Sequence, residues 1–247
     1  MNNLMSSLLP ADWLAVGFFA FAWIGYSWFS AQMSKSRNSL SSMLSLYRRD
    51  WMYQLLRREL RIHDVTLVGG FERNCAFFAS SALLILAGLL SLLGYAPEAT
   101  AVFERIHQPI ALPRFVTITL LLAGIFTYTF FVFTWSMRQF GFVGIMIVSA
   151  PTPNTRSYSK RQREEFSDHC ARIADLASVH FNHGLRAYYF ALAVLGWYFS
   201  PLVFIIFTSA VVLILYQREF ASRAGRALRL AHKDIDPHIN ELDDNQN

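Results

Sequence analysis

The sequence predicts an all-α integral membrane protein, a polytopic helical bundle with five transmembrane helices and amphipathic cytoplasmic helices. Three observations lead to this fold class. The 247 residues are 54% hydrophobic and only 16% charged, whereas soluble domains are roughly 25% charged. Long stretches contain no charged residue, and the basic residues between them gather on one side of the implied membrane. We therefore read the chain, 1–247, as a single membrane domain.

The last apolar run decides the number of predicted spans. Residues 187–217 are 31 uncharged residues in a row, and one straight helix of that length would measure about 47 Å against a hydrocarbon core of roughly 30 Å. Ser200 and Pro201 interrupt the run, and proline favours the first turn of a helix while disfavouring helical geometry in the residue before it. The run therefore predicts a hairpin of two short spans, 184–199 and 201–217.

Three further spans precede this hairpin. The first, 13–34, is uncharged and has tryptophan and tyrosine near its ends, where such rings favour the membrane interface. The second, 74–95, lies in 24 uncharged residues that are rich in small side chains, which favour close helix packing in lipid. The third, 115–137, consists of the 23 uncharged residues between Arg114 and Arg138. All three are long enough to cross a bilayer.

The segments between the spans are more polar. Segments 38–68 and 159–181 combine charged residues with apolar residues at helical spacing, and each predicts an amphipathic cytoplasmic helix. The first is read as a connecting helix on the bundle, with a specific lipid-recognition helix as the alternative. Residues 95–113 contain three prolines and predict a loop on the far side. Residues 139–149 either extend the third helix or lie at the interface, and 218–247 form a tail that is first basic, then acidic.

The distribution of basic residues predicts the orientation. With five spans and the N-terminus outside, 20 of the 22 basic residues lie on the inner side, and only Arg105 and Arg114 lie outside. This is the bias that the positive-inside rule describes. Residues 1–12 lack the basic start of a signal peptide, so we expect the first span to be retained as an anchor. The predicted location is the plasma membrane, or the inner membrane of a bacterium, with the C-terminus inside.

Several function classes are disfavoured. Most aromatic residues lie inside the apolar runs rather than among basic ones, so no nucleic-acid partner is expected. Cys75 and Cys170 cannot form a disulfide framework, and we expect reduced, inert thiols. No motif of a serine hydrolase, a phosphate-binding loop or a zinc protease is present. No cofactor is expected, and the residues favour a protein without enzymatic activity.

The strongest candidate site lies where two spans are expected to begin at the inner face. The second and fourth spans open with basic and amide side chains, and helix N-termini there would add donors for an anion. The side chains that would converge on a phosphate or carboxylate are Arg73, Asn74, Asn182, Arg186 and Tyr188. In the alternative reading, Arg73 and Arg186 only anchor the fold, by reaching headgroups or by pairing with Glu72, Asp64 or Asp175.

Two other sets of polar residues were weighed. No metal site is predicted; the alternative is His169, His180 and His183, which share one helix face but match no recognised ligand signature. A pore would need polar neutral groups, since no charged residue lies in the middle of a span. Candidates for such a pore are Thr117, Thr119, Thr127, Tyr128, Thr129 and Thr134, although hydroxyls at such positions more often bond to helix backbone.

Short strings along most of the chain resemble one known family. They are Asn182-x-Gly184-x-Arg186-x-Tyr188-Tyr189-Phe190, Arg73-Asn74 at the start of an apolar helix, and Arg218-Glu219-Phe220-x-Ser222. Together they resemble the domain-of-unknown-function family numbered five-nine-nine, whose members are multi-pass membrane proteins without an assigned activity. The resemblance implies a shared fold and no particular chemistry.

Two functional hypotheses follow. The first is a homo-oligomeric transport or channel subunit with an anion or lipid-headgroup site at its cytoplasmic mouth, which the paired basic residues Arg73 and Arg186 favour. The alternative is a membrane scaffold or accessory protein that binds lipids or protein partners and transports nothing. A lipid-modifying enzyme comes third. Under each hypothesis the expected partners are membrane lipids with anionic headgroups at the cytoplasmic face.

Overall fold

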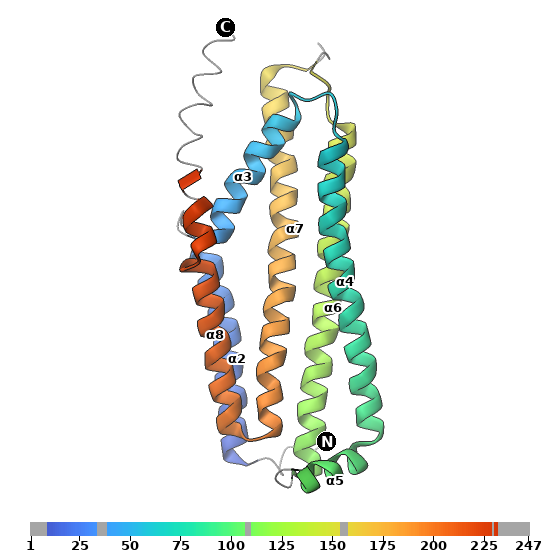
Figure 1. Cartoon of the computed structure of the whole chain (residues 1–247), viewed down its shortest axis with the longest axis vertical. Coiled ribbons are helices and arrows are strands. Elements are labelled where there is room, and N and C mark those ends of the chain that lie inside the picture. The colour runs from blue at the N-terminus through green and yellow to red at the C-terminus, as the bar shows by residue number, and fades with distance from the viewer. Residues whose placement is uncertain (1–8, 34–38, 107–109, 154–157, 229, 232–247) are drawn as a thin grey trace.

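The computed structural model describes residues 9–33, 39–106, 110–153, 158–228 and 230–231 as an elongated bundle of helices (Figure 1). No strand occurs among these residues. In chain order the elements are α2 (Pro10–Met33), α3 (Leu40–Leu55), α4 (Ile62–Gly94), α5 (Ala96–Ile106), α6 (Leu112–Ser149), α7 (Lys160–Leu195), the 3-10 helix η1 (Gly196–Tyr198) and α8 (Pro201–Phe220). The predicted all-helical class is confirmed.

Three long helices run the length of the molecule, and shorter helices cover each half. Figure 1 shows α4, α6 and α7 extending from one end to the other, with α2 and α8 beside the half where α5 lies across the end. In the other half, α3 leans across α7 toward the start of α4. We call the two ends the α5 end and the α3 end.

Within the described residues, four helices are long and apolar enough to cross a membrane, namely α2, α4, α6 and the segment Pro201–Leu228 that contains α8. The multi-pass character that the sequence predicts therefore has support from the structure. The predicted fourth span, 184–199, forms the end of α7 and the η1 turn. It is not one of these four helices, because only nine residues of α7, 187–195, form an uncharged run before Gly196. The count of five spans and the orientation stay predictions.

Several predicted boundaries are wrong. The segment 38–68 is two helices, because the chain turns at 56–61 and both α3 and α4 then bury apolar side chains in one core. The helix of the second span therefore begins at Ile62 rather than near 74. The predicted loop 95–113 contains α5. Residues 139–149 extend the third helix, which was one of the two alternatives, and α6 ends only at Ser149.

The segments 159–181 and 184–199 are also joined, as the single helix α7 and its 3-10 end. Gly184 lies inside α7 and does not end the helix. Because glycine has no side chain, α6 can pack closely against α7 at this position. A Cβ there would lie 2.6 Å from the Phe133 ring of α6. The predicted turn at Ser200 and Pro201 is confirmed, since the Ser200 side chain accepts a hydrogen bond from the Val203 amide at 3.1 Å and Pro201 begins α8.

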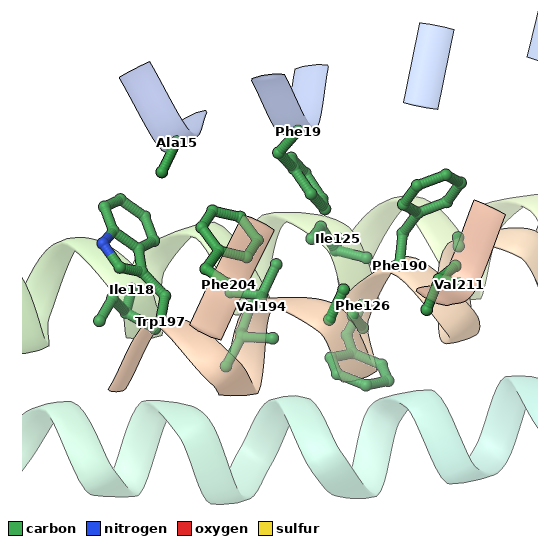
Figure 2. Packing of buried hydrophobic residues seen from close by; sticks show 14 of the residues in the cluster. Ala15, Phe19, Ile118, Ile125, Phe126, Phe190, Val194, Trp197, Phe204 and Val211 are labelled. Atoms are coloured by element: carbon green, nitrogen blue, oxygen red, sulfur yellow. The ribbon is translucent and has the colours of Figure 1, made fainter. Parts of the chain in front are cut away.

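The half at the α5 end has an apolar core with many aromatic rings. Figure 2 shows Phe19 of α2 near Phe190 of α7 and Phe204 of α8, with α6 contributing aliphatic side chains. The Trp23 and Phe190 rings are stacked with centroids 5.1 Å apart, an arrangement that adds to the gain from burial. This core fixes α7 and α8 against α2 and α6 in the apolar half.

The half at the α3 end has a separate core, made by α3, α4, α6 and α7. Its buried members include Met52, Val68, Phe140, Ile147 and Cys170. Here the helices are also joined by polar contacts across long sequence distances. The most extensive of these hold α3 against α7, and they frame the candidate site.

Candidate functional site

Two pockets flank the contact between α3 and α7, at the junction of the two halves. The first, which we call the aromatic pocket, has a volume of about 470 Å³, and its aromatic lining is Tyr47, Trp51, Phe71, Phe140 and Phe181. The second, which we call the serine pocket, has a volume of about 290 Å³ and is lined by Ser41, Ser42, Ser45, Asp175, His183 and Arg186 among others. Arg48, Ser178 and Asn182 line both pockets. The pockets are therefore neighbours with a shared wall.

The shared wall is held by an ion pair. Arg48 of α3 pairs with Asp175 of α7, and their side chains are 18% and 31% exposed. The Ser45 hydroxyl donates to the other carboxylate oxygen of Asp175 at 2.5 Å. Asp175 thus neutralises the charge of Arg48. Both of its oxygens are engaged, so it is not a partner for the second cation that lines the serine pocket.

That cation is Arg186, which lies on α7 between α2 and the pocket. Its guanidinium donates to the Ser30 hydroxyl at 2.6 Å and lies 5.5 Å from the centre of the Tyr26 ring. Among the described residues Arg186 has no carboxylate partner. Glu219 lies in the same region, but its carboxylate accepts a hydrogen bond from the Ser41 amide at 3.1 Å. Arg186 is thus a half-buried cation without a salt bridge.

His183, one turn before Arg186, adds no charge to the serine pocket at neutral pH. It lies just before the predicted span 184–199. Burial, together with the nearby positive charges of Arg186 and His180, lowers its pKa to about 4. The imidazole is therefore neutral at pH 7. With Arg48 paired to Asp175, Arg186 is the other cation of the pocket, and the nearby Glu219 carboxylate attracts it without a direct salt bridge.

The structure places the five predicted site residues in different surroundings, and only three of them line a pocket. Asn74 lines the aromatic pocket, Arg186 the serine pocket, and Asn182 both. Arg73 lines neither pocket. Tyr188 points into the bundle, where its hydroxyl donates to the Phe78 carbonyl at 2.9 Å.

The proposed contribution of helix N-termini is wrong. Helices α4 and α7 begin at Ile62 and Lys160, so Arg73 and Asn182 lie well inside their helices and not in the first turn. Backbone amides at such positions are used within the helix and are not free to bind an anion. Two of the three alternative partners are engaged elsewhere, since Asp64 binds Arg58 and Trp51, and Asp175 binds Arg48. The third, Glu72, forms no ion pair with Arg73 or Arg186 in the part of the chain that the structure describes.

The threonine hydroxyls of the third span form hydrogen bonds within their own helix, α6. The hydroxyls of Thr117, Thr119, Thr127, Thr129 and Thr134 each bond to the carbonyl four residues earlier, at 2.7 to 2.9 Å. The sequence-based alternative of backbone bonding is thus confirmed for these five threonines. They offer no row of free hydroxyls along α6.

Residues 14–224 match a family model described as "Protein of unknown function, DUF599". The chain belongs to the DUF599 family. The match contains every residue named in the two pockets, and it confirms the resemblance drawn from the sequence motifs. Neither the curated proteins nor the solved structures gave a match. The family description names no activity, so the function of this DUF599 chain is argued from the geometry of its site.

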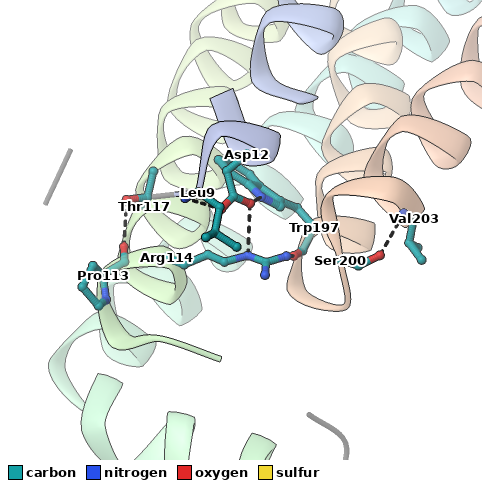
Figure 3. Close-up of polar contacts among 8 residues, drawn as sticks. All are labelled: Leu9, Asp12, Pro113, Arg114, Thr117, Trp197, Ser200 and Val203. Carbon is teal, nitrogen blue, oxygen red and sulfur yellow. Dashed lines mark hydrogen bonds and ion pairs between the residues drawn. The ribbon is translucent and has the colours of Figure 1, made fainter. Parts of the chain in front are cut away.

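A second polar cluster of this DUF599 chain was missed from the sequence. Figure 3 shows Asp12, Arg114 and Trp197 meeting at the α5 end, where α2, α6 and η1 come together. The Trp197 indole donates to Asp12 at 2.7 Å, and the Arg114 guanidinium lies 3.4 Å from the same carboxylate oxygen and donates to the Trp197 carbonyl at 2.6 Å. Asp12 is 1% exposed. In the sequence, this cluster was indicated only by the positions of Asp12 directly before the first predicted span and of Arg114 directly before the third.

The histidines predicted as an alternative metal site are spread along α7. His180 and His183 have ring centroids 6.3 Å apart, and the His180 Nδ1 atom lies 2.7 Å from the Leu176 carbonyl oxygen. His169 is located about three turns earlier on the helix. The part of the chain that the structure describes contains no group of three or more histidine, cysteine or acidic side chains arranged for a metal.

Proposed function

We propose that this membrane protein binds an anionic amphiphile, of the chemical class of a phospholipid, across the serine and aromatic pockets. The observation that carries the proposal is Arg186, a half-buried cation that lines a pocket and has no carboxylate partner among the described residues. A buried charge without a counter-ion is costly. A phosphate group in the serine pocket would supply that counter-ion.

The serine pocket also offers a neutral donor for a phosphate. Ser41, Ser42 and Ser45 lie in the first turns of α3, beside Arg186. The Ser42 hydroxyl donates to the Ser39 carbonyl and the Ser45 hydroxyl donates to Asp175, so the Ser41 hydroxyl is the one that can donate to a phosphate oxygen. The Arg186 guanidinium and the Ser41 hydroxyl thus offer a phosphate one charged and one neutral donor in the serine pocket.

The aromatic pocket fits the apolar part of the same ligand. It shares a wall with the serine pocket, and its lining is dominated by aromatic side chains. Asn74 and Arg186 mark where the uncharged stretches 74–97 and 187–217 begin, which is the level expected for lipid headgroups. A headgroup near Arg186 would therefore have apolar surface within reach on the other side of Arg48.

For the topology we propose five crossings, with α7 as the fourth, the N-terminus outside and the α3 end in the cytoplasm. The support is the placement of 20 of 22 basic residues on one side and the packing of Phe190 and Val194 in the apolar core. The membrane is then the plasma membrane, or the inner membrane in a bacterium. Reporter fusions at residues 157 and 200, which lie before and after α7, should locate these sites on opposite sides of the membrane, and the same side for both would contradict a crossing by α7.

A binding or accessory role has more support than transport. The core of the α5 half is filled by packed rings, among them Phe19, Phe190 and Phe204. The threonines of the third span are bonded to their own helix. A transport or channel subunit, the other hypothesis from the sequence, would need a passage formed between copies of the chain.

The proposal is tested by thermal unfolding of the detergent-solubilised protein with added phosphatidylglycerol, phosphatidylcholine or inorganic phosphate. A ligand that binds only the folded state raises the unfolding temperature. Phosphatidylglycerol should stabilise the protein more than phosphatidylcholine, and Arg186→Gln should remove that difference. The control is Arg218→Gln, since Arg218, like Arg186, donates to a hydroxyl and lies over a tyrosine ring, both from Tyr189, but lines neither pocket.

The three arms distinguish the possible sources of the phosphate. Stabilisation by inorganic phosphate alone, lost in Arg186→Gln, would assign the serine pocket to a free anion. Equal stabilisation by both lipids, or a phosphatidylglycerol effect that survives in Arg186→Gln, contradicts the proposal.

A further inference from the structure

The outer face of α4 and α6 stays apolar beyond the length of a membrane crossing. Ile145 and Val148 follow Arg114 by more than thirty residues on one helix, a distance of about 45 to 50 Å compared with a hydrocarbon core of roughly 30 Å. They are 68% and 70% exposed, and Ile62 on α4 is 70% exposed. Aliphatic surface of this kind outside the bilayer marks an interaction site.

A groove runs along this face. Its volume is about 490 Å³, and it is lined by Val65, Gly69 and Glu72 of α4 and by Gly141, Gly144, Ile145 and Val148 of α6. A Cβ on Gly144 would be in contact with Val68 at 3.8 Å, so the two helices approach closely there. Small residues at a groove floor also allow a further helix to come near.

Two opposite charges lie at this groove, since Glu72 lines it and Arg73 is the next residue of α4. A carboxylate oxygen of Glu72 lies 3.2 Å from the place of a Cβ on Gly141, and the Arg73 guanidinium lies 3.5 Å from that on Gly69. Among the contacts of the described residues, neither side chain takes part in an ion pair or hydrogen bond. A two-fold axis would bring each Glu72 close to the Arg73 of the other copy.

The geometry points to a second copy of this chain, docked face to face on α4 and α6 at the α3 end. The apolar rim would be buried in the interface, and the adjacent charges of Glu72 and Arg73 would be self-complementary. This assigns a role to Arg73, which lines neither candidate pocket. The interface does not depend on the lipid proposal, because it uses none of the residues that line the serine or aromatic pocket.

The interface is tested by cysteine cross-linking of the full chain in native membranes. Ile145→Cys should give a disulfide-linked dimer under mild oxidation. The matched control is Leu176→Cys, on α7 in the same half and 44% exposed. The natural cysteines, Cys75 and Cys170, are buried and should give no cross-link in the unsubstituted protein. A yield at Ile145 no higher than at Leu176, or a cross-link to a different protein, would overturn the proposal.

Charge reversal provides the second readout. Glu72→Arg and Arg73→Glu, each in the Ile145→Cys background, place like charges together and should lower the dimer yield several-fold. The double variant Glu72→Arg/Arg73→Glu restores unlike pairs and should recover it. Gel filtration of each variant shows that the fold is kept. A yield that is unchanged in the single variants, or not recovered in the double variant, contradicts a two-fold interface at these residues.

Discussion

The two halves of the bundle are held together by different forces. In the α5 half, the core is apolar and aromatic, and Asp12 and Arg114 form its one ion pair among the described residues. In the α3 half, polar contacts join helices that are far apart in sequence, as in the pairs of Arg48 with Asp175 and of Arg49 with Asp168. The α5 half is thus held mainly by the packing of apolar side chains, whereas the α3 half is held by both packing and ion pairs.

Arg61 shows how polar contacts stabilise the α3 half. Its guanidinium donates to the carbonyls of Ile147, Ala150 and Pro151 at 2.5 to 3.1 Å. These carbonyls lie at the end of α6, where backbone acceptors have no partner in the helix. A single side chain from the start of α4 therefore caps the end of α6 through three carbonyls, whereas Arg114 at the start of α6 donates to one carbonyl, that of Trp197, in the α5 half.

The largest expected effect on stability comes from the ion pair of Asp12 and Arg114 in the otherwise apolar α5 half. Asp12→Ala should lower the free energy of unfolding by about 3 kcal/mol, because it removes a buried carboxylate and leaves the half-buried Arg114 charge and the Trp197 indole without their partner. Denaturant unfolding in detergent measures the loss. Asp12→Asn keeps an acceptor for Trp197 and should cost less. Equal stability of Asp12→Ala and wild type would show that this ion pair does not hold the α5 end.

Packing at the junction of the halves gives the next effect. Gly184→Ala should destabilise the protein by about 1 to 3 kcal/mol, since the new Cβ would lie 2.6 Å from the Phe133 ring, which must move. Gly88→Ala is the control, because a Cβ there meets nothing within 4 Å, and its effect should stay within about 0.5 kcal/mol. Similar melting temperatures for the two variants would mean that α6 and α7 separate easily.

The charge-dependent half should respond locally and to salt. Arg48→Gln should cost about 1.5 kcal/mol, because a charged hydrogen bond to Asp175 is lost. Arg49→Gln should cost less than about 1 kcal/mol, since its pair with Asp168 is exposed. Hydrogen exchange should show faster opening of α3 in Arg48→Gln, and in wild type at high salt, while α8 is unchanged. Equal acceleration in α8 would argue against separate modes of stabilisation.

The smallest effect is a dependence on pH. The pKa of His183 is lowered from 6.5 to about 4 by burial and by the nearby Arg186 and His180. Below pH 6.5 the unfolded chain therefore binds a proton that the folded chain does not, so stability falls as the pH falls from 6.5 toward 4. His183→Gln should reduce the loss of melting temperature between pH 7 and pH 5. An identical pH profile in the variant would show that His183 titrates normally in the folded protein.

The halves also differ in how much of them could be predicted from sequence. Uncharged stretches and Pro201 predicted the apolar helices and the turn between α7 and α8, because lipid imposes length and burial on each segment separately. The α3 half was predicted less well. Arg48 and Asp175 are 127 positions apart, and no local pattern identifies such a pair. The start of α4 at Ile62 was missed for the same reason, since it is held by contacts to α3 and α6.

The candidate site was predicted in part. Asn182 and Arg186 were identified because they precede an uncharged stretch, and the structure places both at the serine pocket. Arg73 was grouped with them by analogy between two presumed helix starts, and it faces another side of the bundle. The serines of α3 were missed, because their role depends on how α3 leans across α7 (Figure 1).

The most direct test of the lipid proposal is an experimental density map of the protein in nanodiscs that contain phosphatidylglycerol. The predicted result is headgroup density within hydrogen-bonding distance of Arg186 and of Ser41 at the start of α3, continuing past Arg48 toward the aromatic pocket. Density for lipids elsewhere around the bundle, together with an Arg186 side chain that contacts only Ser30 and Tyr26, would contradict it.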